Sequence, residues 1–301
     1  MTIVASTFFD LSVNFQLVVS GLALGAIYSV VALGFVLVEK STAVLNLAVG
    51  EFLMLGSYFG VAFFMERQTN FFIGTFVITV IMALFGLVIH YGIMRPMVGQ
   101  GFFAIVLATI GIATVIRAVV QIRFGPLEKG NLTALPTETI EVAGTSIRWV
   151  DIIVMLVVAA AVGAFLAFYS LTRTGLHMRA VASNIEAAAG VGIDPDRMYA
   201  VTWAMAIGIA GLGGVMLGHF TPSINPALAA IGLRAFPAAA IGGFTSVGGS
   251  IIGGLIVGVV EMLAGGHLGT KWREPVAFGI LFAVLIFKPT GLFGQKDIER
   301  I

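Results

Sequence analysis

Cysteine is absent from this chain of 301 residues, and charge is scarce. Without cysteine the protein has no disulfide framework and no thiolate metal site. Charged residues make up 10% of the sequence, whereas a soluble domain carries about 25%. Because 59% of the residues are hydrophobic, the chain cannot cover itself with polar surface in water. The composition therefore predicts an integral membrane protein.

Other absences narrow the function. The net charge of +1 gives no indication of nucleic acid as a partner, and four scattered histidines are too few for a metal cluster. No Lys or Arg precedes Lys40, so the basic region of a cleavable signal peptide is missing. We therefore expect the first apolar run to be retained, with its N-terminus exported.

Apolar runs predict an all-α polytopic protein with about seven spanning helices, since about 20 apolar residues cross the hydrocarbon core. The expected spans are 17–38, 43–65, 71–94, 102–123, 150–171, 200–220 and the shorter 275–287. The whole chain, 1–301, is expected to form one transmembrane domain. Its 38 glycines suit helices that approach closely, as in the G-x-x-x-G pair of Gly21 and Gly25.

Lys and Arg divide evenly between the two sides, so the positive-inside rule does not orient the whole chain. The uncharged N-terminus is the one local signal. It places the connection 172–199 in the cytoplasm and the connections 124–149 and 221–234 outside.

The region 235–263 predicts a glycine-rich broken hairpin. Its apolar halves, 235–243 and 251–263, are each too short to span at about 1.5 Å per residue. We expect a re-entrant or broken helical hairpin, with Gly242 and Gly243 at a tip that lines a translocation path. Irregular backbone of this kind is tolerated at membrane depth only beside protein or a water-filled cavity.

The connection 172–199 combines helical spacing with charge. Its alanine-rich stretch 177–190 is good helix material, and Asp194-Pro195-Asp196 supplies turn chemistry after it. One interpretation is an ordinary interfacial helix between two spans. The other is a helix whose small alanine face docks into a groove of a partner protein.

A family resemblance favours the second interpretation. Glu186-Ala187-Ala188, followed at the fourth position by Gly192, resembles the core of the EAA motif of ABC importer permeases, without its later Ile-x-Leu-Pro part. The wider chain resembles the LivH-type branched-chain amino acid permease family. The matching blocks are Thr174-Gly175 with Arg179-Ala180, Ala187 to Ala189 and Gly192-Ile193; Gly25-Ala26-Ile27-Tyr28; Asn46-Leu47-Ala48-Val49-Gly50-Glu51-Phe52; Ala235-Phe236 with Ile241-Gly242-Gly243; and Pro289-Thr290-Gly291-Leu292-Phe293-Gly294.

The resemblance implies a type II ABC importer-like permease of the bacterial cytoplasmic (inner) membrane, importing branched-chain or similar hydrophobic amino acids. A LivM-type permease would complete a heterodimeric pore, two cytoplasmic ATPase subunits would bind ATP-Mg, and an extracytoplasmic binding protein would deliver the substrate. Arg179, Glu186, Ala187, Ala188 and Gly192 would belong to the ATPase-coupling helix. The chain has no G-x-x-x-x-G-K-[ST] loop, so no cofactor and no enzymatic activity are expected in it.

Asn46, Glu51 and Tyr58 form the candidate translocation path. An ionisable residue inside a membrane run is a functional-site hypothesis, and Glu51 shares a helix face with Tyr58. Alternatively, Asn46 caps a helix that begins near residue 47, with Glu51 at its positive end. The sequence departs from the family here, because Val49 occupies a position where histidine is common.

Arg117 and Glu261 are two further charges in apolar runs. Each could hold a substrate carboxylate or amine, but we expect Arg117 to snorkel to the interface and Glu261 to lie at the rim near Lys271. The alternative function is a secondary transporter of a small organic solute that couples to protons through Glu51.

Overall fold

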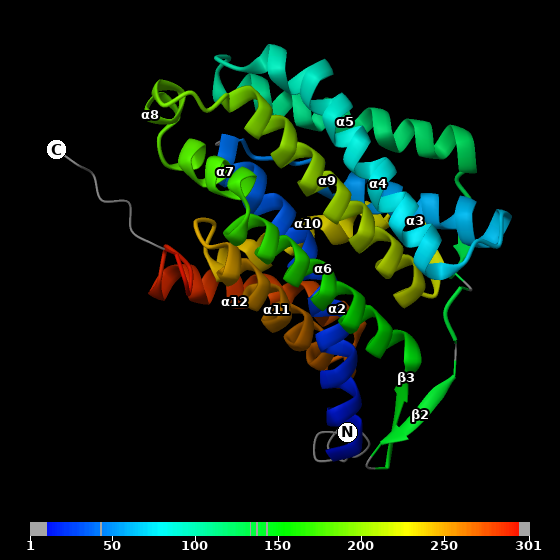
Figure 1. Ribbon diagram of the computed structural model, residues 1–301. Helices are drawn as coiled ribbons and strands as arrows, with labels where there is room; N and C mark the ends of the chain where they lie inside the picture. Colours follow the sequence, from blue (N-terminus) through cyan, green and yellow to red (C-terminus); the bar gives the residue numbers. More distant parts are fainter. Residues whose placement is uncertain (1–10, 43, 133, 137, 143, 295–301) are drawn as a thin grey trace.

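The fold is a bundle of helices with two small antiparallel strand pairs at one end (Figure 1). The computed structural model describes residues 11–42, 44–132, 134–136, 138–142 and 144–294. The long helices are α2 (Leu11–Thr42), α3 (Val49–Gly60), α4 (Phe71–Ile89), α5 (Phe102–Phe124), α6 (Trp149–Leu171), α9 (Pro195–Phe220), α10 (Leu228–Gly242), α11 (Val247–His267) and α12 (Arg273–Phe287). π-helical residues extend α3 and α4. Within these ranges, seven helical segments are long and apolar enough to cross a membrane.

Helix α2 runs through the middle of the bundle (Figure 1). It is buried along most of its length and packs against α11, α9, α10 and α6. A second contact layer joins α9 to α3 and α4. By contrast, α4, α5 and α6 each expose rows of large apolar side chains, which suits a surface facing lipid or another membrane subunit.

Glycine permits the close helix contacts. A Cβ atom built on Gly25 of α2 would lie 2.8 Å from the Cα atom of Leu255, and one on Gly21 would lie 2.7 Å from that of Val259. On the facing helix, a Cβ atom on Gly258 would overlap the backbone of Gly25. Lipid provides no hydrophobic drive between helices, so such backbone proximity supplies much of the packing energy.

The glycine-rich region differs in part from the prediction. It forms two helices, α10 and α11, whose turn spans residues 243–246. The second half was expected to be too short to span, which is wrong, because Ser246 caps α11 early and the helix continues for 21 residues. The predicted seventh span at 275–287 corresponds to α12, which has only 15 residues, and α11 is the seventh candidate span instead.

The connection 172–199 forms two helices, α7 (Arg173–Ser183) and α8 (Ile185–Gly190), where a single helix over 177–190 was expected. Asn184 separates them. Its backbone is extended, with φ −160° and ψ 109°, and its side-chain oxygen accepts a hydrogen bond from Ala187 N–H. An N-cap of this kind starts a new helix, so the asparagine breaks the predicted one. We call this end of the bundle the inner end.

The opposite, outer end carries the strands. β1 (Lys129–Gly130) pairs with β4 (Ser223–Ile224), and β2 (Thr139–Val142) pairs with β3 (Thr145–Arg148). Leu132 follows β1 and is buried beside Gly60 and Gly218, and its N–H donates to the carbonyl of Gly218. The connection 124–149 is thereby fastened to α9.

The helix packing predicts opposite effects for two glycine-to-alanine changes. Gly258→Ala places a Cβ atom on the α2 backbone and should lower the free energy of unfolding by about 1–3 kcal/mol. Gly279→Ala in α12 meets nothing within 4 Å and should raise it by up to about 1 kcal/mol through helix propensity. The SDS-unfolding midpoint of each purified variant measures the change in stability. Equal midpoints for the two variants would contradict the close contact of α11 with α2.

Candidate functional site

Two helices begin side by side within the bundle. Helix α3 starts at Val49 after a non-helical segment, and α10 starts at Leu228 after β4. A Cβ atom on Gly50 would overlap the carbonyl of Ala229, and one on Gly232 would overlap the backbone of Gly50. The two helix starts are thus in direct backbone contact.

A cavity of about 320 Å³ opens beside this contact. Glu51, in the first turn of α3, is almost fully buried, whereas the Arg117 side chain on α5 is 51% exposed. Nη2 of Arg117 donates to Oε1 of Glu51, so the two form an ion pair at the cavity wall. The prediction that Arg117 snorkels to the interface is wrong. The remaining walls are apolar, from Leu47, Pro226, Ala227, Ala229, Ala230 and Leu233.

The segment before α3 is fixed by polar contacts. Oδ1 of Asn46 accepts from Ala48 N–H, and Leu47 N–H donates to Oγ1 of Thr109. Asn46 is buried and does not line the cavity. Asn46 orders the turn before α3 but does not cap the helix, because the N-cap residue is Ala48 and no side chain caps that end. Glu51 lies in the first turn of α3, whose positive end favours its negative charge. The predicted capping role of Asn46 is therefore wrong, and the predicted position of Glu51 near the start of the helix is confirmed.

One face of α5 carries polar side chains at membrane depth. Thr114, Arg117 and Gln121 are spaced at i, i+3 and i+7, and all three are exposed. The hydroxyl of Thr114 is satisfied by the Ile110 carbonyl, but Arg117 and Gln121 are costly to place in hydrocarbon. This polar face of α5 was missed from the sequence, although its helical spacing was visible there.

Tyr58 lies two turns beyond Glu51 on α3. Its side chain is fully buried and packs 5.0 Å from the ring of Phe124, measured between centroids. Among the described residues its hydroxyl has no hydrogen-bond partner. Tyr58 does not line the cavity beside Glu51, so its place in a path remains a prediction.

Gly242 and Gly243 lie at the other end of α10 from this cavity. Gly243 has φ +100°, which favours glycine, and it closes the turn toward α11. The carbonyl of Gly242 accepts from Phe293 N–H, and that of Ile241 accepts from Leu292 N–H. The structure does not bring these glycines to Glu51, and the C-terminal loop holds them in place.

A second charged cluster is centred on a buried carboxylate. Glu261 of α11 is 1% exposed, accepts from the hydroxyl of Tyr28 at 2.7 Å, and pairs with Nη1 of Arg234 at 3.1 Å. Arg234 also pairs with Glu274 of α12. The expectation that Glu261 is a rim residue near Lys271 is wrong. This cluster joins α2, α10, α11 and α12, so its role is to hold these helices together.

At the inner end, Gly192 terminates α8 in a Schellman motif. Gly192 has φ +87°, its N–H donates to Ala189, and Ile193 N–H donates to Ala188. Ala188 is buried under this turn, whereas Glu186 and Ala187 are exposed. The glycine of the EAA-like pattern therefore has a conformational role in ending the helix.

Arg179 contacts its own chain. Its guanidinium lies 5.3 Å over the ring of Tyr169 in α6, and Nη2 donates to the Ser170 carbonyl at 3.4 Å. It therefore anchors α7 to the end of α6. Whether it also contacts an ATPase stays a prediction.

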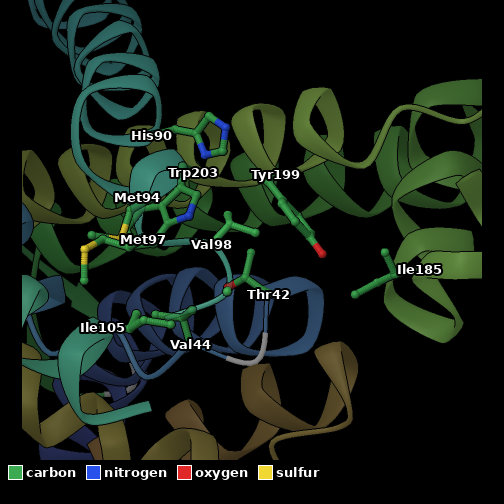
Figure 2. A pocket seen from close by; sticks show the side chains of 11 residues that line it. Thr42, Val44, His90, Met94, Met97, Val98, Ile105, Ile185, Tyr199 and Trp203 are labelled. Carbon is green, nitrogen blue, oxygen red and sulfur yellow. The ribbon is translucent and has the colours of Figure 1, made fainter. Parts of the chain in front are cut away.

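A cavity of about 200 Å³ lies between the inner-end helices and the bundle (Figure 2). Figure 2 shows Thr42 and Tyr199 between Ile185, which comes from α8, and the cluster of Met94 and Trp203. Beside it, His90 and Arg95 both contact Asp196, at 3.1 and 3.2 Å. These contacts join the end of α4 to the first turn of α9, directly behind α8.

Comparisons with known proteins agree over nearly the whole chain. Residues 17–287 match the family described as branched-chain amino acid transport system / permease component. The chain is 30% identical to the high-affinity branched-chain amino acid transport system permease protein LivH of Salmonella typhimurium, across 95% of this chain and 97% of that protein. It is 29% identical to the permease protein BraD of Pseudomonas aeruginosa, with the same coverage. No solved structure matches.

The two kinds of ion pair predict different stability effects. Glu261→Ala leaves the buried Tyr28 hydroxyl without its acceptor and Arg234 with Glu274 alone, and should lower the free energy of unfolding by about 1–3 kcal/mol. Glu66→Ala breaks an exposed pair with Arg123, 3.8 Å apart, and should cost about 0–1 kcal/mol. SDS-unfolding midpoints of the two variants measure which change destabilises the protein more. A larger loss for Glu66→Ala than for Glu261→Ala would contradict the structural role of the Glu261 cluster.

Proposed function

The chain belongs to the family of branched-chain amino acid transport permease components, and we propose that it forms one half of the translocation pathway of an ATP-driven importer. It is a multi-pass protein of the cytoplasmic membrane. The proposed substrates are branched-chain or similar hydrophobic amino acids, as the names of its relatives suggest. The observation that carries this proposal is the charged cavity inside the membrane, where α3 and α10 begin.

The polar face of α5 supports a shared pathway. Gln121 is exposed on this face, as is half of the Arg117 side chain beside its contact with Glu51, and lipid is a poor environment for either residue. A second permease of the LivM type, packed against this face, would enclose them together with a water-filled path. The site would then lie between the two subunits, with this chain supplying one wall.

The inner end supports docking of ATPase subunits. The segment of α7 and α8 exposes apolar side chains, with Ile185 of α8 50% accessible and Val191, directly after α8, 78% accessible. Exposed apolar residues on a connection in water are typical of a protein–protein contact. Two ATPases that bind ATP-Mg would act on this segment from the cytoplasm, and an extracytoplasmic binding protein would deliver substrate at the outer end.

Reconstitution tests the proposal as a whole. Proteoliposomes that contain this chain, a LivM-type permease and two ATPases should take up labelled leucine only with ATP and the binding protein. Omission of either the second permease or the ATPases should abolish uptake. Uptake by this chain alone, driven by a pH gradient, would instead establish the secondary-transporter alternative.

The docking surface predicts the behaviour of a matched pair of variants. Val191→Asp places a charge on the exposed apolar surface of the inner end and should lower co-purification of the ATPases about tenfold or more. Leu127→Asp changes a residue of equal exposure, 76%, at the outer end and should leave co-purification unchanged. Both variants should insert normally, and equal ATPase yields would place docking elsewhere.

A further inference from the structure

We infer that Glu51 and Arg117 together bind a zwitterionic α-amino acid, with the ammonium on Glu51 and the carboxylate on Arg117. The inference rests on the proposed function and assigns its substrate site to named groups. It starts from the cavity beside α3 and α10, which both side chains line.

The two charged groups differ in freedom. The Glu51 side chain is 7% exposed and sits in the first turn of α3, whose start is held by Asn46 and Thr109. The Arg117 side chain is 51% exposed at the end of a long stem on α5. One partner is thus a fixed anion and the other is a movable cation, so the pair can open without disturbing the backbone.

The pair also leaves bonding capacity for a ligand. A guanidinium has five N–H donors, and contacts among the described residues occupy Nη2 of Arg117 with one Glu51 oxygen. The second carboxylate oxygen of Glu51 has no hydrogen-bond partner in that same set of residues. A ligand carboxylate fits the planar fork of an arginine in bidentate geometry, and an ammonium fits a carboxylate.

Charge balance selects a zwitterion. An isolated charge at membrane depth is unfavourable. A ligand with one charge would take one partner and leave the other unpaired. A zwitterion exchanges one ion pair for two, so neither Glu51 nor Arg117 is left without a counter-charge.

The other walls select the side chain. Leu47 and Leu233 flank the charged pair, and Pro226 with three alanines completes the lining. A polar ligand side chain would lose its hydrogen bonds to water there without replacement, which is unfavourable. The site therefore suits an α-amino acid with an aliphatic side chain.

A charge swap separates ligand binding from a structural ion pair. In the complete transporter, Glu51→Gln and Arg117→Gln should each lower ATP-driven leucine uptake about tenfold or more. The double variant E51R/R117E keeps an ion pair between the two positions, so the transporter should assemble. Its uptake should stay low because the fixed and the movable charge have exchanged sign. Wild-type uptake in the double variant would overturn the inference.

A single cysteine gives a second measurement at the cavity itself. Ala230 lines the cavity, and the chain has no other cysteine, so Ala230→Cys reports on this position alone. Without the binding protein, L-leucine should slow its modification by a charged methanethiosulfonate about tenfold. 4-Methylpentanoate and 3-methylbutylamine, which each lack one charge, should not.

Two controls complete the test. Ser183→Cys, on the exposed end of α7, should be modified at the same rate with and without leucine. Glu51→Gln combined with Ala230→Cys should lose the protection. Equal protection by the single-charge compounds, or protection that survives Glu51→Gln, would overturn the inference. Absence of ATP-driven uptake by the wild-type transporter would refute the proposed function separately.

Discussion

The close approach of glycine-bearing backbones is the interaction on which the rest of the structure depends. Hydrocarbon gives no hydrophobic gain when two apolar helices meet, so packing at short range must hold them. The contact of α2 with α11 through Gly25 and Gly258 builds the centre of the bundle in this way. The same device at Gly50 and Gly232 brings the starts of α3 and α10 together and so creates the cavity beside Glu51.

Two ion-pair clusters at membrane depth illustrate two uses of charge. Arg234 is held between Glu261 and Glu274, and Glu261 is also bonded to Tyr28, so the charges of that cluster are paired with one another between packed helices. Arg117 meets Glu51 at the edge of a cavity and remains half exposed. Charges paired between packed helices fix those helices, whereas a charged pair beside a cavity is suited to exchange partners with a ligand.

Sequence reasoning reached the fold class and most spans, because apolar runs of sufficient length have few alternatives in a membrane. The predictions were wrong where a single local contact determines where a helix begins or ends. Asn184 breaks the predicted inner-end helix by capping a second one, and Ser246 starts α11 earlier than the apolar pattern indicated. The pairing of Glu51 with Arg117 joins residues 66 apart, which spacing on one helix cannot reveal.

The fastening of the outer connection makes the two ends of the subunit mechanically unequal. β1 is paired to β4, and Leu132 is fixed to α9 by both its backbone and its side chain, whereas the inner end of α9 is joined to the end of α4 through the side chains of His90, Arg95 and Asp196. Helix α9 has 26 residues and is about 39 Å long, so a tilt about its fastened outer end would move its inner end most. A displacement of α8 would reach Gly211, where α9 packs on Gly56 of α3, at about a third of its size. The outer connection would therefore determine how much of a displacement at the cytoplasmic surface reaches the helix that carries Glu51.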